Sequence, residues 1–224
     1  GQEIIDDLLA RVDGQQVMDL FHDFSYPLPA TVGCELLGIP TADRDECKRH
    51  IGDLVSFVGS VGPALVDAAG PAYDSYKALA EYFCSLAEQR RRRPTEDMFT
   101  ALVTGMDGGD VLDATELVGL SVFLYVAGHE TTVGLLINGL LALMQHPGEL
   151  ERLQNDWSLV DSTIEECLRY ESPIQIGTRL VVKDVEIRGQ KIREGDAIVL
   201  MLAAANRDPG QFPDPDRFDI TRKD

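Results

Sequence analysis

The chain has 224 residues, 44% of them hydrophobic and 26% charged, and it carries a formal net charge of −18 at pH 7. This length suits one large domain or two small ones, and the composition is that of a globular protein. So strong a negative charge repels the phosphate backbone of nucleic acids. It therefore argues against nucleic-acid binding and leaves a basic protein partner open.

The cysteines and the apolar segments indicate the compartment. The four cysteines lie far apart and form no CxxC pair: Cys34, Cys47, Cys84 and Cys167. We interpret them as reduced thiols rather than as a disulfide framework. The N-terminus does not resemble a signal peptide, and the apolar run over residues 117–128 is too short to cross a bilayer before Glu130 interrupts it. We therefore expect a cytoplasmic protein without a membrane span, and both ends of the chain look cut from a longer sequence.

The N-terminal part is predicted to be helical. Apolar residues recur with helical spacing over residues 4–12. A second helix over residues 30–37 is closed by Gly38, because glycine suits the residue after a helix end. A third helix begins at Thr41 or Asp43.

Residues 51–70 are apolar and rich in glycine. The pattern predicts two helices broken near Gly62, which form either a mobile lid or a surface helix pair. Pro71 is placed in the first turn of the next helix, which runs to Arg93. The arginines at its end, residues 90–93, are a candidate nucleic-acid patch. In so acidic a chain we favour their interaction with the helix C-terminus.

One long apolar stretch, residues 115–146, organises the chain. Asp113 and Glu116 form a capping-box pattern in front of it, so we predict a single helix that ends at Pro147. A helix that is hydrophobic all round is buried in a core. Burying Glu130 in its middle then costs free energy unless the carboxyl group has a partner or a functional role. We expect function at this position.

The spacing of apolar residues changes in the last third of the chain. Helices are predicted over residues 148–154 and 159–171, and β-like runs over residues 178–182, 185–187, 191–192 and 197–202. The fold class is mainly α with a small β region, in a single partial domain over residues 1–224. Within it residues 1–175 are mostly helical, residues 176–205 form the β region, and residues 206–224 form an ordered loop.

The middle of the long stretch has the sequence AGHETT at residues 127–132. Ala127 and Gly128 share a helix face with Thr131, so a flat ligand can approach the backbone there. A threonine hydroxyl can bond the carbonyl one turn back and open the helix locally. Glu130 beside Thr131 forms an acid–alcohol pair able to relay protons in a dry site, although a paired polar group of the core gives the same pattern.

Further candidate residues follow towards the C-terminus. Glu166 and Arg169 lie three positions apart on a predicted helix, a spacing that a surface ion pair also gives. Arg179 at the start of the first β run either holds a carboxylate or lies in solvent at a sheet edge. The final loop carries Arg207 and Arg217, which either pair with Glu166 or tie the loop down.

Taken together, these motifs resemble one family. AGHETT, Glu166-x-x-Arg169, Arg179, the segment 206–209 and the PDPDRF loop at 213–218 occur in the order found in bacterial soluble cytochrome P450 enzymes, the haem-thiolate monooxygenases. Each motif is weak alone, but the ordered set covers nearly the whole chain. The chain is similar to the part of that fold which runs from about helix D and is organised around the long central I helix.

The resemblance implies a role for each position. Glu130 and Thr131 would deliver protons to dioxygen, with Ala127 and Gly128 forming the oxygen groove. Glu166, Arg169 and Arg217 would form a structural core, and Arg179 would bind a haem propionate. Val126, Ile174, Ile176 and the region 51–70 would line or cover the substrate pocket.

The resemblance also implies haem b as the cofactor. The reaction would insert one atom of O2 into an apolar small molecule, by hydroxylation or epoxidation, with electrons from a ferredoxin-type partner. The family's iron ligand is a cysteine in a glycine-rich loop, and none of the four cysteines has such surroundings, so we expect no metal ligand in this chain. Cys34 and Cys84 are predicted to be inert core thiols. The alternative is a truncated, haem-free P450-like scaffold that binds another protein; a plain ligand-binding helical bundle does not explain the ordered motifs.

Overall fold

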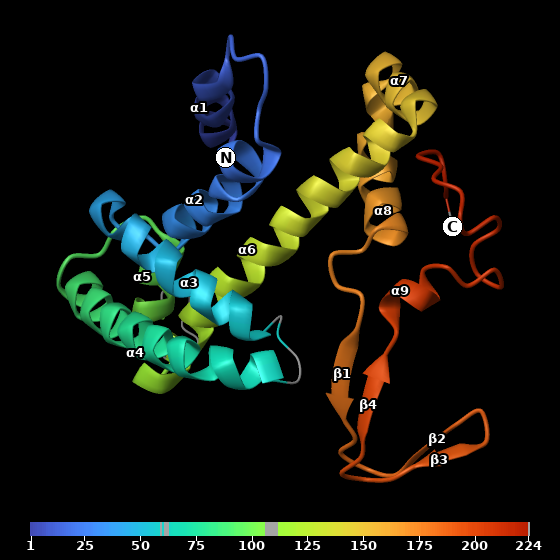
Figure 1. Ribbon diagram of the computed structural model, residues 1–224. Coiled ribbons are helices and arrows are strands. Elements are labelled where there is room, and N and C mark those ends of the chain that lie inside the picture. The colour runs from blue at the N-terminus through green and yellow to red at the C-terminus, as the bar shows by residue number, and fades with distance from the viewer. Residues whose placement is uncertain (59, 61–62, 106–111, 224) are drawn as a thin grey trace. The chain divides into compact units, whose positions relative to one another are not determined.

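The computed structural model describes residues 1–58, 60, 63–105 and 112–223. The chain divides into two compact units, Gly1–Val133 and Gly134–Asp224. Helices make up most of the chain, and the strands are short and confined to the C-terminal part (Figure 1). The predicted class, mainly α with a small β region, is therefore confirmed.

The described part of the first unit is built from helices. In chain order they are α1 Gln2–Val12, the π-helix η1 Leu20–Ser25, α2 Pro27–Leu36, the 3-10 turn η2 Thr41–Asp43, α3 Arg44–Val58, α4 Pro63–Arg92, α5 Met98–Thr104 and the first part of α6 Ala114–Gln145. The predicted N-terminal helices are all present. The second begins three residues earlier than predicted, because proline suits the first turn of a helix.

The end of α2 is held by polar contacts with two later helices. Gly38 follows α2 with φ +61°, a left-handed conformation that favours glycine. Arg90 near the end of α4 donates to the Gly38 carbonyl and pairs with Asp97 at 3.2 Å. Asp97 in turn caps α5 by accepting from the Thr100 amide at 2.6 Å. Arg90 therefore has a structural role.

Pro71 lies inside α4 and not in its first turn, which corrects the prediction. The first turn of α4 begins at Pro63, and the residues from there to Pro71 are mostly exposed. A proline inside a helix leaves one carbonyl without its N–H partner, and water can satisfy that carbonyl at an exposed position. The predicted break between two helices is present between Val58 and Pro63. Residues 59, 61 and 62 lie outside the described residues, and the lid remains a prediction.

The core of the first unit forms where α3, α4, α5 and α6 meet. α3 packs along α4 (Figure 1). The buried rings of Phe83 and Phe99 lie 5.5 Å apart, and Tyr125 of α6 lies 2.8 Å from the sulfur of Cys34. Each large buried apolar side chain contributes roughly 1.5–3 kcal/mol, so this cluster is a main source of stability.

The long helix α6 begins with the predicted capping box. Asp113 accepts from the Glu116 amide at 2.9 Å, and Glu116 accepts from the Asp113 amide at 3.0 Å. Among the described helices, α6 is the one long and apolar enough to cross a membrane. The core helix of a globular protein has the same length and composition, and α6 contributes side chains to the cores of both units.

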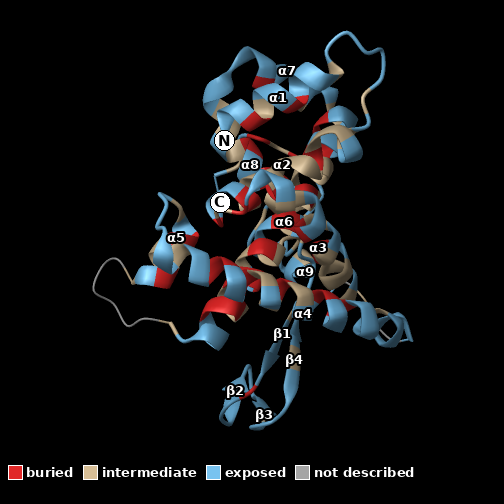
Figure 2. Ribbon diagram, turned by 90° about the vertical axis from the view of Figure 1, so that its left-hand side faces the viewer, coloured by how far each residue is buried: buried red, intermediate tan, exposed pale blue. Residues whose placement is uncertain are grey.

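The prediction of a helix buried all round is wrong. Only 28% of the most apolar window of α6 is buried, and buried and exposed positions alternate along it (Figure 2). Phe123, Leu141 and Met144 are exposed. The apolar pattern shows which side chains avoid water, whereas the fold decides which of them are covered.

The second unit continues with shorter elements. They are α7 Pro147–Asn155, the 3-10 turn η3 Trp157–Leu159, α8 Val160–Tyr170, β1 Gly177–Leu180, β2 Val185–Ile187, β3 Gln190–Ile192, β4 Ala197–Leu200 and α9 Leu202–Ala205. β1 pairs antiparallel with β4, and β2 with β3. Arg188 and Gly189 have φ of 51° and 79°, which suits the tight turn between β2 and β3. The last predicted β run is too long, since Leu202 begins a helix.

The second unit has its own core, in which Leu143 and Leu153 pack with Phe218 and Ile220. Phe218 and Ile220 anchor the predicted ordered loop. Residues 206–223 contain no helix or strand. Gly139 of α6 allows a close approach, because a Cβ there would lie 3.2 Å from the sulfur of Cys167.

Candidate functional site

In the centre of α6, two threonine hydroxyls bond back onto the helix. Thr131 Oγ1 donates to the Ala127 carbonyl at 2.9 Å, and Thr132 Oγ1 donates to the Gly128 carbonyl at 3.0 Å. These are the predicted bonds across one turn, although α6 stays helical through them. A Cβ built at Gly128 meets no atom within 4 Å. The backbone is therefore accessible at Gly128.

Glu130 is not buried, which corrects the prediction of a costly acid in the core. Its side chain is 59% exposed, so water provides the partner that burial would remove. The buried polar residue is its neighbour His129, which is 2% exposed. Burial lowers the pKa of His129 and outweighs the opposing effects of the Tyr26 carbonyl and Glu130. The ring is therefore neutral at pH 7.

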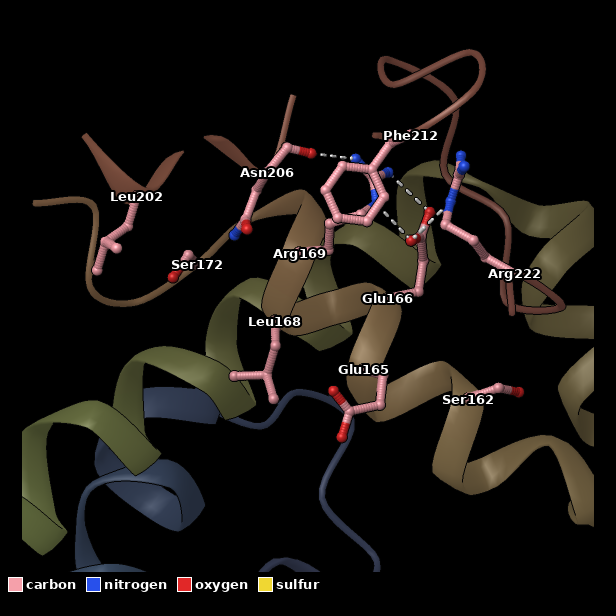
Figure 3. Close-up of a pocket in the computed structure, with 10 residues that line it drawn as sticks. All are labelled: Ser162, Glu165, Glu166, Leu168, Arg169, Ser172, Leu202, Asn206, Phe212 and Arg222. Carbon is pink, nitrogen blue, oxygen red and sulfur yellow. Dashed lines mark hydrogen bonds and ion pairs between the residues drawn. The ribbon is translucent and has the colours of Figure 1, made fainter. Parts of the chain in front are cut away.

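Glu166 and Arg169 form a buried ion pair on α8. Arg169 Nε lies 2.6 Å and Nη2 lies 2.9 Å from the two carboxylate oxygens, a fork geometry. Arg169 also donates to the Asn206 carbonyl at 2.8 Å (Figure 3). It donates to the Pro215 carbonyl at the same distance. The surface-pair alternative is thereby excluded, and the pair joins α8 to the C-terminal loop. A cavity of about 390 Å³ lies beside the pair.

The third side chain at this pair is Arg222, not Arg217 as predicted. Arg222 Nε lies 3.2 Å from Glu166 Oε2 (Figure 3). Arg217 instead contributes its main-chain carbonyl, which accepts from Arg169 at 3.1 Å. Its side chain is 60% exposed beside Asp219. Because the carbonyl of Arg217 faces Arg169, its side chain lies on the outer side of the loop.

Arg179 lies exposed on β1, and its Nη1 donates to the Thr178 carbonyl at 2.8 Å. In the part of the chain that the structure describes, no carboxylate forms an ion pair with it. Ile174 and Ile176, in the loop before β1, are about half exposed, and Val126 packs against the core of the first unit. The pocket roles of these residues stay predictions.

The described cysteines do not resemble metal ligands. Cys34, Cys47 and Cys167 are buried, and burial raises the pKa of each thiol, to about 12 for Cys47 and about 11 for Cys167. They are neutral thiols, whereas a metal binds the thiolate. Cys84 is exposed, so the prediction of a core thiol is wrong there and confirmed for Cys34. Among the described residues, no group of three His, Cys, Asp or Glu side chains could hold a metal ion.

A long helix with AGHETT at its centre, followed by a buried Glu-x-x-Arg pair tied to a proline-rich loop, also occurs in known proteins. Residues 74–222 match the family model described as Cytochrome P450. The chain belongs to the cytochrome P450 family. The resemblance predicted from the ordered motifs is thereby confirmed.

Bacterial P450 proteins are similar to this chain over nearly all of its length. It is 38% identical over 220 residues to a biotin biosynthesis cytochrome P450 of Bacillus subtilis, which covers 98% of the chain. It is 40% identical over 225 residues to a vitamin D(3) 25-hydroxylase of Pseudonocardia autotrophica, again over 98% of the chain.

A solved structure shows the same fold. The crystal structure of P450BioI in complex with hexadec-9Z-enoic acid ligated acyl carrier protein matches with a TM-score of 0.89 at 38% identity, over 98% of this chain and 56% of that chain. The chain spans 55% and 53% of the two relatives above, about half of their length.

Two residues of the site were not singled out from the sequence. His129 is one residue of the AGHETT segment, and a histidine within an apolar helix is a signal in itself, because it needs a buried partner. Arg222 lies five residues after Arg217 in the same loop. Either arginine could reach Glu166 as far as its position in the sequence shows. No local pattern separates the two.

Proposed function

We propose that the protein carrying this chain is a haem-dependent monooxygenase. It inserts one oxygen atom of O2 into an apolar small molecule, by hydroxylation or epoxidation. The observation that carries the proposal is the acid–alcohol pair of Glu130 and Thr131 at the centre of α6. The chain that contains this pair belongs to the P450 family.

Glu130 and Thr131 have the chemistry of a proton-delivery pair. The carboxylate of Glu130 is in contact with water and can exchange protons with it. Thr131 Oγ1 donates to the Ala127 carbonyl and keeps lone pairs that can accept another proton. The hydroxyl can therefore take a proton from Glu130 and release its own beside Gly128.

Haem b is the cofactor that the family implies, and the residues of this chain fit it in part. In the first unit, the accessible backbone at Gly128 admits a flat group. In the second unit, the guanidinium of Arg179 would hold an anionic propionate. Bound haem supplies the activation of dioxygen. The described cysteines do not fit its sulfur ligand, so the proposal requires a thiolate from the remainder of a longer protein.

An apolar substrate is supported by the relatives and by the loop before β1. One relative is a vitamin D(3) hydroxylase, and the P450BioI structure contains a hexadecenoic acid carried by acyl carrier protein. Ile174 and Ile176 present half-exposed apolar side chains. We infer a pocket-lining role for these two residues of the second unit and, separately, for Val126 of the first unit. We assign the supply of electrons to a ferredoxin-type partner.

A haem-free scaffold that binds another protein is the second candidate. It is favoured by one observation, the lack of a suitable cysteine among the described residues. The retained acid–alcohol pair, the buried Glu166–Arg169 pair and Arg179 argue against it, because a scaffold has no chemical need for all of them.

The two candidates differ in haem content. The complete protein is expected to bind one haem and to give the carbon monoxide absorbance shift that is typical of a thiolate-ligated haem. A protein that folds, takes up no haem and shows no such shift would be the scaffold.

The role of Thr131 is tested by Thr131→Ala in the complete protein. General acid catalysis contributes roughly 100-fold or more to a proton transfer, so we expect product formed per O2 consumed to fall at least tenfold. Thr132→Ala is the matched control, since Thr132 makes the same bond to the helix one position on. Equal coupling in Thr131→Ala and wild type would contradict proton delivery by this hydroxyl.

A further inference from the structure

We propose that Gly134 and Asn138 of α6 are positioning residues that fix the place of Ile174 and thereby determine which carbon atom of an apolar substrate is oxidised. The inference rests on the proposed function, because Ile174 is one of the residues inferred to line the substrate pocket. It starts from a helix glycine that has no room for a methyl group. All three residues belong to the second unit.

The loop of residues 171–176 joins the end of α8 to β1 (Figure 1). Its two isoleucines are half exposed, Ile174 at 48% and Ile176 at 50%. Burial of apolar area stabilises a position in proportion to the area covered. A loop whose largest apolar side chains are half exposed gains little in this way, so contacts of its other residues have to fix its position.

Two residues of α6 contact the beginning of this loop. Asn138 Nδ2 donates to the Glu171 carbonyl at 3.0 Å. A Cβ built at Gly134 would lie only 2.9 Å from the Cβ of Pro173, a distance at which one of the two has to move. Gly134 and Asn138 are four positions apart and therefore lie on the same face of α6. This face thus holds the loop by one hydrogen bond and one close packing contact.

The close approach explains the glycine at position 134. In the interior of a helix glycine is less favourable than alanine, because it loses more conformational freedom on folding. The backbone of Gly134 is helical, so no left-handed conformation requires glycine there. The remaining reason is the room that the ring of Pro173 needs.

A displacement of Pro173 is passed on to Ile174. The proline ring fixes the torsion φ of its own residue, so the ring cannot turn away from an added methyl group unless the main chain moves. Ser172 Oγ donates to the Ile174 carbonyl at 2.9 Å and closes a turn around Pro173. Residues 172–174 are therefore expected to move together.

Ile176 has a different anchor. The Gln175 carbonyl accepts from the Ala203 amide at 3.0 Å, and Gly177 then begins β1, which pairs with β4. Ile176 is thus held by the sheet, whereas Ile174 follows α6. A change at Gly134 should therefore move the first isoleucine and leave the second in place.

The position of Ile174 affects the product because oxidation depends on geometry. A misplacement of about 1 Å can change a rate by on the order of 100-fold. An apolar substrate offers few polar groups for orientation, so the side chains around it decide which carbon atom is presented. A shift of Ile174 therefore changes the ratio of the products.

The direct test is NMR of isoleucine methyl groups in the complete protein, with the signals of Ile174 and Ile176 assigned by replacing each with valine. We expect Gly134→Ala to move the Ile174 signal and to leave the Ile176 signal nearly unchanged. Gly139→Ala is the matched control, since a Cβ there would crowd the sulfur of Cys167 on α8 at 3.2 Å. An unmoved Ile174 signal in Gly134→Ala, or an equal movement in Gly139→Ala, would overturn the proposal.

Asn138→Asp tests the hydrogen bond without adding a methyl group. The ionised carboxylate keeps the shape of the side chain and cannot donate to the Glu171 carbonyl. We expect the Ile174 signal to move or broaden in this variant as well. A signal identical to that of the wild type would overturn the role of Asn138.

The second test measures the products formed from dodecanoic acid, an unbranched apolar chain whose methylene groups give distinguishable hydroxylated products. We expect Gly134→Ala to change the ratio of the two main products by about threefold or more, and Gly139→Ala to change it less. The ratio does not depend on how much protein is folded or loaded with haem. An unchanged ratio in Gly134→Ala would contradict control of specificity by this residue.

The inference and the proposed function fail in different ways. A complete protein that binds no haem and consumes no O2 would contradict the proposed function, while the isoleucine signals would still decide whether Gly134 and Asn138 position the loop. An active monooxygenase with an unmoved Ile174 signal in Gly134→Ala would overturn the inference alone.

Discussion

The carboxylate of Glu166 is buried; it receives hydrogen bonds from Arg169 and from the backbone, and it forms an ion pair with Arg222. Arg169 bonds both oxygens, Arg222 Nε lies 3.2 Å from Oε2, and the Asp219 amide donates to Oε1 at 2.8 Å. A buried charge is tolerated only when its partners compensate for the lost water. Each donor should therefore matter for stability in proportion to its burial.

Arg222 and Arg217 allow a matched comparison. Arg222 is 10% exposed at its ion pair with Glu166, whereas the side chain of Arg217 is 60% exposed. We expect Arg222→Ala to lower the free energy of unfolding by on the order of 3 kcal/mol, and Arg217→Ala by less than about 1 kcal/mol. Chemical denaturation measures both. Equal losses would show that the two arginines share the role.

His129 should make stability depend on pH. Its pKa in the folded protein lies below the ordinary value of 6.5, chiefly because of burial. The unfolded chain therefore binds the proton more readily, and stability is lost as the pH falls from about 6.5 through the folded value. We expect this loss to be smaller in His129→Gln. Parallel curves of unfolding free energy against pH for the two proteins would contradict it.

At the scale of elements, glycines determine how some helices end. Gly38 after α2 and Gly14 after α1 both have left-handed backbones, with φ of 61° and 76°. A Cβ at Gly14 would meet nothing within 4 Å, whereas one at Gly38 would overlap Oδ2 of Asp97. The two positions share the backbone strain and differ in the space available.

Gly38→Ala and Gly14→Ala separate strain from overlap. The left-handed backbone alone costs an alanine roughly 1–2 kcal/mol, which is the loss expected for Gly14→Ala. Gly38→Ala must also displace Asp97 from Thr95 and Arg90, which should add about 1–3 kcal/mol. Thermal or chemical unfolding gives both values. A loss at Gly38 no larger than at Gly14 would show that Asp97 moves without cost.

At the scale of the whole molecule, charge is the dominant long-range effect. The chain has 38 acidic and 20 basic residues. Like charges repel one another more strongly in the compact state than in the unfolded chain, because they lie closer together. The excess of carboxylates should therefore lower stability when little salt is present.

Salt should stabilise the protein for this reason. Raising the ionic strength from about 10 mM to about 150 mM shortens the Debye length from about 30 Å to about 8 Å, so the repulsion is screened. We expect the thermal midpoint to rise at neutral pH and to change little near pH 4.5, where the net charge is small. A midpoint that falls with salt at neutral pH would mean that attractive ion pairs dominate.

Features that depend on near neighbours along the chain follow from the sequence alone. The capping box of Asp113 and Glu116 and the bond from Thr131 to the Ala127 carbonyl join residues no more than four positions apart. Local geometry is nearly the same in every protein, so such patterns are predictable. The order of the motifs also sufficed for the family, because it is a property of the chain alone.

Which side chains are covered, and which arginine reaches Glu166, depends on how distant parts of the chain pack together. His129 is buried and Glu130 is exposed although they are adjacent, and Arg222 reaches the carboxylate that Arg217 was predicted to bind. Each outcome depends on groups far away in the sequence, such as Tyr26 for His129. Burial is decided by contacts across the fold. The spacing of apolar or charged residues along one helix or loop does not show which distant residue each side chain will contact.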